Sequence, residues 1–401
     1  MRKIITCGWL FAAVDESVQE NMALVVEDGK IALVCPRDKL PQMEGEQIDF
    51  SQKFVMPGLI DAHIHICSEG GANIFSYDKL PGTLAFEAME RARQNLYAGF
   101  TTIRDEGAPD FVDVSLRDAI NAGRIPGPRM LVSGKCIGAT GGHADSHFAP
   151  AFSDMTKSLI INGPDEARKA ARYTIKYGAD QVKLMATGGV VTIGDEPGAQ
   201  ELTFEEMRAA IEVAQMHGKL TSAHAHGAAG IKDAVRAGIT SIEHGMMMDD
   251  EAIDMMAEHG TWLLPTIIAG FKIVSEGPAA KLNPSFIEKA TRCLENHHTN
   301  LTKCRKQGVR IGFGTDAGTP MNFHGKQALE FSLMVEAGFT PVETLLCATR
   351  ENARLIGWQD RVGTLEKGKF ADIVALDVNP IKDITAMQNV ASVIKNGEVV
   401  R

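Results

Sequence analysis

The chain has 401 residues, of which 44% are hydrophobic and 23% are charged, and its formal net charge at pH 7 is −10. This composition is typical of a globular protein with room for one large domain or several smaller ones. The acidic balance argues against nucleic-acid binding, and no apolar run approaches the roughly 20 residues that span a membrane. Seven scattered cysteines without a C-x-x-C pair suit a reducing compartment, so we expect a cytoplasmic protein that binds neither nucleic acid nor membrane.

The first 56 residues read as short strands joined by polar turns. Their basic start and apolar continuation mimic a signal peptide, but Thr6, Cys7 and Gly8 interrupt the apolar run and no small-residue cleavage site follows. The sequence EDGK at 27–30 is a hairpin signal. The tail again alternates short β runs with glycine turns. We expect residues 1–56 and 361–401 to pair into one small β-sandwich.

Residues 57–360 alternate short apolar runs with helical patterns, the signature of a parallel β/α architecture. The eight apolar runs are 58–66, 100–107, 129–137, 181–187, 220–226, 241–245, 262–268 and 311–318. Eight strands with eight crossovers predict an α/β fold of the (β/α)8 TIM-barrel type. The alternative is a doubly wound open sheet, which is disfavoured because no G-x-G-x-x-G follows the first strand.

Helix start signals support the helical segments between these runs. Thr203 and Glu206 have the spacing of a capping box, as do Thr340 and Glu343. Asn283 precedes a proline that suits the first position of a helix.

Polar residues collect at the carboxyl ends of the apolar runs, where a β/α barrel has its active site. They are His63, His65, Arg104, Asp105, His143, Lys183, His224, His226, His244 and Asp316. His63 and His65 alternate on one strand, so both imidazoles face the same side and can bind one metal ion. Together with His224, His244 and Asp316 they predict a metal site. The nitrogen-rich set with one carboxylate suits zinc, and five ligands exceed the needs of one tetrahedral ion, which indicates two metal ions.

Lys183 lies in a short apolar strand, QVKLMAT. A buried, unpaired ammonium is costly, so this lysine must lose its proton or find a partner. Two interpretations stay open at this point. The lysine is either part of the predicted site or snorkels outward from the edge of the strand.

Several motifs resemble those of the amidohydrolase superfamily: VMPGLIDAHIHI, VKLMATGG, AHAHG, SIEHG, GFGTDAG and the tail GTLEKGKFADIVALD. They resemble most the branch with imidazolonepropionase-like proteins, metal-dependent prolidases and carboxypeptidases, and they cover nearly the whole chain in order. In binuclear members the lysine of strand 4, here Lys183, reacts with CO₂ to form a carbamate that bridges two metal ions. A neutral, buried amine is nucleophilic toward CO₂, and two dications balance the anionic product.

The resemblance also implies which residues hold the two ions that the carbamate bridges. His63, His65 and Asp316 would hold the more buried ion, and His224 and His244 would hold the other. Asp316 would also accept a proton from the attacking water and deliver it to the leaving amine.

Three further histidines are candidates for contact with the substrate. His143, in the glycine-rich segment TGGHAD, resembles the histidine that polarises the substrate carbonyl in this family. The alternative for His143 is a loop residue in solvent. The family uses the first histidine of strand 5 as a ligand, so His226 becomes a substrate contact. His324 is either a substrate contact or a helix cap.

These residues predict hydrolysis of an amide or peptide bond by a metal-activated hydroxide. The AHAHG and TGGHAD segments resemble dipeptidase- and carboxypeptidase-like members, so we expect a dipeptide or an N-acyl amino acid as the substrate. One alternative is a mononuclear hydrolase or deaminase that acts on a cyclic C–N bond, and such relatives lack the carboxylated lysine. The other is a catalytically inactive scaffold, which typically loses metal ligands. The sequence leaves open a homo-oligomer.

Overall fold

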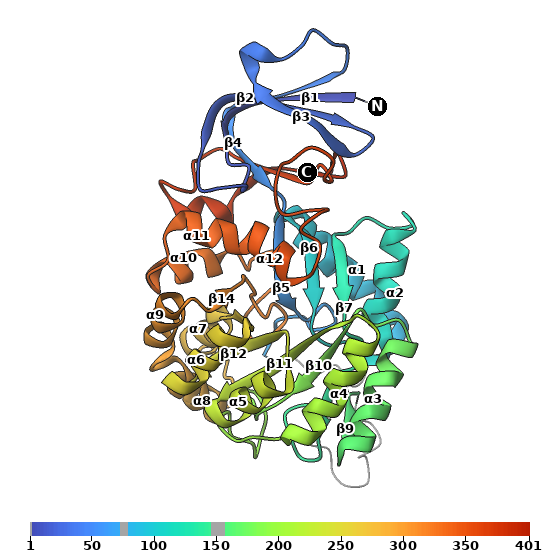
Figure 1. Ribbon diagram of the computed structural model, residues 1–401, viewed down its shortest axis with the longest axis vertical. Coiled ribbons are helices and arrows are strands. Elements are labelled where there is room, and N and C mark those ends of the chain that lie inside the picture. The colour runs from blue at the N-terminus through green and yellow to red at the C-terminus, as the bar shows by residue number, and fades with distance from the viewer. Residues whose placement is uncertain (1, 73–78, 146–156) are drawn as a thin grey trace.

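The computed structural model describes residues 2–72, 79–145 and 157–401, and it has an α/β fold in which parallel strands alternate with helices (Figure 1). The α/β class predicted from the sequence is therefore confirmed. Each of the eight predicted apolar runs contains a strand, and all pairings among these strands are parallel.

Strands from the two ends of the chain form one seven-stranded sheet, drawn at the top of Figure 1. Its strands are β1 (Arg2–Leu10), β2 (Gln19–Glu27), β3 (Lys30–Pro36), β4 (Glu46–Pro57), β15 (Ile373–Leu376), β16 (Val390–Lys395) and β17 (Glu398–Val399). The predicted EDGK hairpin is confirmed, because Glu27 pairs with Lys30 across the β2–β3 turn. β4 joins the two segments, since it pairs with β1 on one side and with β15 on the other. This sheet has its own buried cluster, to which Ile5, Leu24 and Ile373 belong.

The parallel strands fall into two hydrogen-bonded sheets. The three-stranded sheet contains β5 (Leu59–Ile64), β6 (Phe100–Asp105) and β7 (Arg129–Val132) in that order. The other sheet has the order β14-β13-β12-β11-β10-β8-β9. Its strands are β8 (Ile137–Ala139), β9 (Leu159–Ile161), β10 (Gln181–Met185), β11 (Leu220–Gly227), β12 (Ser241–Met247), β13 (Trp262–Leu264) and β14 (Arg310–Ile311).

Helices cover the outside of the parallel strands, as α3, α4 and α5 do beside β10 and β11 (Figure 1). The α-helices are α1 (Pro81–Tyr97), α2 (Val112–Asn121), α3 (Pro164–Lys176), α4 (Phe204–Met216), α5 (Ala228–Ala237), α6 (Asp250–His259), α7 (Ile267–Glu276), α8 (Pro284–Leu294), α9 (His297–Gln307), α10 (Leu329–Glu336), α11 (Pro341–Leu346) and α12 (Asn352–Leu355). Both predicted capping boxes are present at the starts of α4 and α11, and Asn283 caps α8. Within the residues described, no helix combines the length and apolar character needed to cross a membrane.

Two of the predicted strands are shorter in the structure than in the sequence-based prediction. The run at 129–137 is interrupted at Gly134, whose φ is +62°, and resumes as β8. Of the run at 311–318 only Ile311 lies in a strand, β14, and Asp316 and Gly318 further along have positive φ values. A residue with positive φ does not fit a regular β-strand, and this backbone is easiest for glycine. The segment after β14 nevertheless stays next to β5.

Backbone hydrogen bonds connect both edges of the three-stranded sheet to the other sheet of parallel strands. Phe313 O accepts from Ala62 N at 3.0 Å, and His63 O accepts from Asp316 N at 2.7 Å, so the segment after β14 lies against β5. At the other edge, Asp180 N donates to Val132 O of β7 at 2.7 Å. The site residues at the ends of distant strands are therefore brought to one place.

The buried side chain of Asn352 stabilises the junction between β5 and the segment after β14. Its Nδ2 donates to Ile60 O and Phe313 O, and its Oδ1 accepts from Phe313 N. Replacing Asn352 by alanine should leave Phe313 N without its partner, remove one hydrogen bond each from Ile60 O and Phe313 O, and lower the free energy of unfolding by about 3 kcal/mol. Urea denaturation followed by circular dichroism measures the change. The exposed Asn296, which makes no side-chain capping bond, is the matched control, and Asn296→Ala should cost much less. Equal losses for the two variants would contradict the role of Asn352.

Candidate active site

A cavity of about 500 Å³ opens where the parallel strands end. Eight of the residues singled out in the sequence line it: His63, His65, His143, Lys183, His224, His226, His244 and Asp316. They come from β5, β10, β11 and β12 and from the segments that follow β5, β8 and β14. The structure therefore brings together residues that are up to 253 positions apart in the chain, His63 and Asp316 being the extremes.

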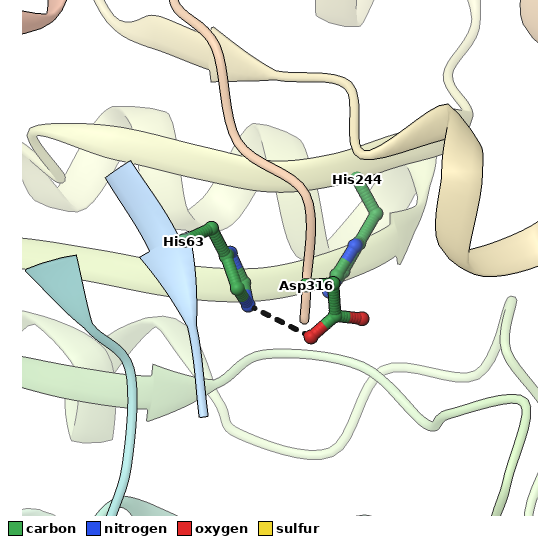
Figure 2. Close-up of side chains that lie close together, drawn as sticks. All are labelled: His63, His244 and Asp316. Carbon is green, nitrogen blue, oxygen red and sulfur yellow. Dashed lines mark ion pairs between the residues drawn. The ribbon is translucent and has the colours of Figure 1, made fainter. Parts of the chain in front are cut away.

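His63, His244 and Asp316 form the tightest group of potential metal ligands in the described residues (Figure 2). One ligand atom of each lies within 4.8 Å of the others, and all three side chains are buried. Asp316 Oδ1 is 3.3 Å from His63 Nε2 and 3.2 Å from His65 Nε2. Neither His63 Nε2 nor Asp316 Oδ1 makes a hydrogen bond within the described chain. Buried polar atoms that converge without hydrogen bonds fit a bound cation, and imidazole with carboxylate is a donor set for divalent metal ions.

The backbone at this group adopts left-handed values that are uncommon outside glycine. The φ angles are +73° at His244, +58° at Asp316 and +44° at Thr266. Such conformations cost about 1–3 kcal/mol each and persist where the surrounding structure imposes them, often at functional sites. Here they occur at two potential ligands that line the cavity, His244 and Asp316, and at Thr266, which contacts His244.

Side chains behind His63 and His244 fix the orientation of both rings. Glu243 Oε2 lies 2.6 Å from His63 Nδ1, and Thr266 Oγ1 lies 2.7 Å from His244 Nδ1. In each case Nδ1 is engaged by the protein, so Nε2 is the nitrogen left for the cavity. Sequence reasoning missed Glu243 and Thr266. The signal for Glu243 was a carboxylate inside the apolar strand SIEHG, where an unpaired charge is costly.

These contacts shift the pKa values of the charged groups. Burial and the nearby Lys183 lower the pKa of His63, but the carboxylates of Asp316 and Glu243 outweigh them and raise it to about 9. Burial raises the pKa of Asp316, yet His63 and His65 hold it well below the usual range for aspartate. Arg104 and His63 likewise lower the pKa of Glu243 against the effect of burial. Both carboxylates are therefore ionised at neutral pH.

Lys183 is paired with a carboxylate that the sequence analysis did not single out. Its Nζ lies 3.2 Å from Glu106 Oε2, and the two side chains are at most 1% exposed. Glu106 Oε1 is also 2.8 Å from Arg104 Nε, and Glu106 accepts hydrogen bonds from Gln181 and Ser222. Lys183 is thus fully buried and lines the cavity, so the interpretation of a lysine that snorkels outward is wrong.

Three more histidines stack around the same cavity. The ring centroids of His143 and His224 are 4.3 Å apart, and those of His226 and His244 are 5.0 Å apart. His224 Nε2 lies 3.1 Å from Gly188 O, which leaves Nδ1 as its other potential ligand atom. Burial lowers the pKa of His143 to about 4 and that of His226 to about 3, so both imidazoles are neutral at pH 7.

The backbone around His143 is shaped to hold its ring. Thr192 Oγ1 lies 2.6 Å from His143 Nδ1, and the carboxylate of Glu201 accepts from the His143 amide at 2.6 Å. A Cβ atom at Gly189 would lie 2.0 Å from His143 Nδ1, so only glycine leaves room for the ring. His143 is therefore held at the cavity and is not a free loop residue in solvent.

The structure does not bring His324 into the cavity. This buried ring contacts Asn95 Nδ2 through Nδ1 at 3.1 Å, and its Nε2 lies 3.1 Å from the carbonyl oxygens of both His65 and Ser68. Both ring nitrogens are engaged by the protein. His324 therefore stabilises the segment that follows β5 and carries His65.

Comparisons with known proteins identify relatives of this chain. Residues 54–400 match the model of the amidohydrolase family. The chain is 32% identical to ochratoxinase of Aspergillus niger over 99% of this chain and 86% of that protein. It is 26% identical to imidazolonepropionase of a Geobacillus species, over 95% and 90% of the two chains. The crystal structure of a Xaa-Pro dipeptidase with methionine bound in its active site superposes with a TM-score of 0.93, at 35% identity over 100% of both chains.

The chain belongs to the amidohydrolase family, as its motifs indicated. It is a hydrolase that acts on carbon–nitrogen bonds. Members of this family generally use divalent metal ions, and the group of His63, His244 and Asp316 provides ligand types for such an ion.

Glu243 should control how tightly a metal ion binds to His63. Replacing Glu243 by glutamine removes the negative charge behind the imidazole and should weaken zinc affinity by about 10- to 100-fold. Competition with a zinc indicator measures the affinity, and the thermal midpoint of unfolding reports the fold. Ser241→Ala is the matched control, because Ser241 donates to Glu243 Oε1 in the same network without touching His63. Unchanged affinity in Glu243→Gln would contradict the supporting role.

Proposed function

We propose that the protein is a binuclear, metal-dependent amidohydrolase that hydrolyses the amide bond of dipeptides or N-acyl amino acids, in the manner of a prolidase or carboxypeptidase. The observation that carries this proposal is a buried lysine, Lys183, in the same cavity as the group of His63, His244 and Asp316. The similarity to an ochratoxinase and to a Xaa-Pro dipeptidase supports this substrate class.

The proposed architecture is an eight-stranded (β/α)8 barrel, formed by residues 57–360, beside a small β-sandwich built from residues 1–56 and 361–401. The parallel pairings and the hydrogen bonds at both edges of the three-stranded sheet support a closed barrel. The seven-stranded sheet, which contains strands from both ends of the chain, supports the small domain.

The proposed ligands fall into two sets. His63, His65 and Asp316 would hold one divalent ion and His224 and His244 the other, most simply zinc given the imidazole-rich set, and a carbamate on Lys183 would bridge them. Support for these sets comes from the short contacts between Asp316 and two imidazoles and from the centroid distance of 4.7 Å between the rings of His224 and His244. Two divalent ions bound there would lower the pKa of an attacking water toward neutrality and polarise the scissile carbonyl.

Asp316 is the proposed proton carrier. Its Oδ1 lies against the imidazoles of His63 and His65, whereas Oδ2 points away from His63 (Figure 2). Because the carboxylate is ionised at neutral pH, Oδ2 can accept a proton from the attacking water and then donate it to the leaving amine. Its left-handed backbone keeps the carboxylate directed into the cavity.

His143 is the proposed donor to the substrate carbonyl. Thr192 Oγ can donate its hydrogen to His143 Nδ1, which places the ring proton on Nε2. A neutral imidazole with Nε2–H directed into the cavity can then stabilise the negative charge that develops on the carbonyl oxygen. His226 also lines the cavity, and because its Nδ1 has no hydrogen-bond partner in the described chain, it is the second proposed contact for the substrate.

The alternative function is that of a mononuclear cyclic-amide hydrolase or deaminase. The 26% identity to an imidazolonepropionase supports this alternative. A buried lysine beside the ligand group favours the binuclear enzyme over this alternative. Elemental analysis of protein grown with added zinc separates the two, since the binuclear enzyme should approach two metal ions per chain. One ion per chain under saturating zinc would select the alternative.

Lys183→Ala should bind at most one metal ion tightly and lose nearly all hydrolytic activity. The variant should still fold, because Glu106 keeps its ion pair with Arg104. Lys183→Arg should fail as badly, since a guanidinium stays protonated and cannot form a carbamate. Elemental analysis gives the metal content, and added acetate should restore part of it in Lys183→Ala. Lys135, a second lysine that lines the cavity, is the control, and Lys135→Ala should keep both ions. Two retained ions and normal turnover in Lys183→Arg would show that no carbamate bridge exists.

His143→Ala should lower kcat by roughly 10²–10³ while metal content stays intact, because the carbonyl loses a preorganised donor. Thr192→Val removes only the hydroxyl that orients the ring and should give a smaller loss of kcat with the ring still present. Steady-state kinetics on a dipeptide and N-acyl amino acid panel, with elemental analysis alongside, measure both effects. A kcat in His143→Ala equal to that of the wild type would exclude the oxyanion role.

A further inference from the structure

One side of the cavity is apolar, in contrast to the histidine-rich side. We call this side the apolar wall, and it consists of Val190, Val191 and Ile193 from the loop after β10, Ile273 from α7, and Phe286 and Ala290 from α8. Ile273 and Ala290 belong to a buried cluster, and Val190, Val191 and Phe286 pack against it. The apolar wall is therefore a packed surface that exists before any substrate binds.

The loop at 188–196 is tied to α8 by a buried lysine. Lys289 is 5% exposed, and its Nζ donates to Thr192 O at 2.8 Å and to Asp195 O. Arg292, one turn further along α8, pairs with Glu196 at 2.7 Å. An ammonium taken out of water must satisfy its hydrogens, and here it does so with carbonyl groups of this loop. The loop and α8 are thus held together as one unit.

The apolar wall lies directly beside a group proposed to act on the substrate. Thr192 stands between Val191 and Ile193 in the chain, and its hydroxyl contacts His143 Nδ1. Ile193 is 60% exposed, although it lines the cavity. A large apolar side chain that is still exposed at the cavity has surface available for burial by a ligand.

We propose that the apolar wall is a subsite for a large aliphatic or aromatic substituent of the substrate, so that the enzyme selects apolar dipeptides or N-acyl amino acids. This inference rests on the proposed function and adds the substrate class. A charged substituent would lose its hydration there without gaining a partner, because all six side chains of the wall are apolar. The ammonium of Lys289 is already bonded to carbonyl groups. A cavity of about 500 Å³ lies within the range that encloses small organic ligands.

Binding of straight-chain carboxylates from propionate to octanoate to the metal-loaded enzyme tests the subsite without any turnover. Affinity measured by calorimetry should rise about threefold to fourfold for each added methylene that reaches the wall. Ile193→Asp should flatten this dependence, and Phe286→Ala should weaken it. Met216→Asp is the matched control, because Met216 is an apolar side chain at the end of α4 that is 77% exposed and outside the cavity lining, and it should leave the dependence unchanged.

Hydrolysis of dipeptides with phenylalanine, leucine, glycine or aspartate is measured in parallel on the same proteins. If the wild type prefers phenylalanine and leucine and Ile193→Asp loses that preference, the subsite is supported. A chain-length dependence that is flat, or equally steep in Ile193→Asp, overturns the subsite even if dipeptides are hydrolysed. A steep dependence that Ile193→Asp abolishes, with no dipeptide or N-acyl amino acid hydrolysed, supports the subsite and overturns the proposed function instead. Thermal unfolding checks that Ile193→Asp, which changes an exposed position, is folded.

Discussion

The buried guanidinium of Arg104 is the interaction on which the arrangement of the site depends. It is fully buried, and it pairs with Glu106 on one side and with Glu243 on the other. Glu106 reaches Lys183, and Glu243 reaches His63, so one continuous network joins the first, second, fourth and sixth predicted strands. Removing Arg104 would leave two buried carboxylates, Glu106 and Glu243, without the guanidinium that pairs with both, which is strongly destabilising. The network therefore fixes the positions of Lys183 and His63 relative to each other before any ligand binds.

This buried charged network lies on the strands or directly after one of them, whereas other parts of the site lie on the segments between them. His63 and Lys183 belong to buried strands, whereas His143 lies on a loop and the apolar wall combines a loop with helices α7 and α8. In β/α folds, strands give a rigid frame and the loops at their carboxyl ends carry variable chemistry. The division here is consistent with that rule. The charged network is part of the strand frame, and His143 and the apolar wall, both proposed to contact the substrate, lie on the loops and helices that follow the strands.

The sequence was sufficient where a local pattern determines the outcome. Alternation on a strand placed His63 and His65 together, and the spacing of Thr203 and Glu206 located the start of a helix. It was insufficient where a residue acts through a partner far away in the chain. Glu243 lies 180 positions from His63, and Thr192 lies 49 positions from His143, and no local period links such pairs. For His324 the sequence suggested a contact that the structure lacks. This histidine follows a predicted strand, but its ring contacts backbone carbonyl groups and does not line the cavity.

Thr192 gives the site a physical link between recognition and chemistry. Its hydroxyl contacts His143 Nδ1, its carbonyl oxygen accepts from Lys289, and its two chain neighbours belong to the apolar wall. A ligand in contact with Val191 or Ile193 therefore packs against the chain neighbours of Thr192, the residue whose hydroxyl orients the His143 ring. Because that residue is 4% exposed and bonded from two sides, it has little freedom to move alone. In the proposed function, part of the binding energy of a substrate that fills the wall would thus hold the ring of His143, the proposed carbonyl donor, in its orientation, and a substrate that leaves the wall empty would lack this contribution.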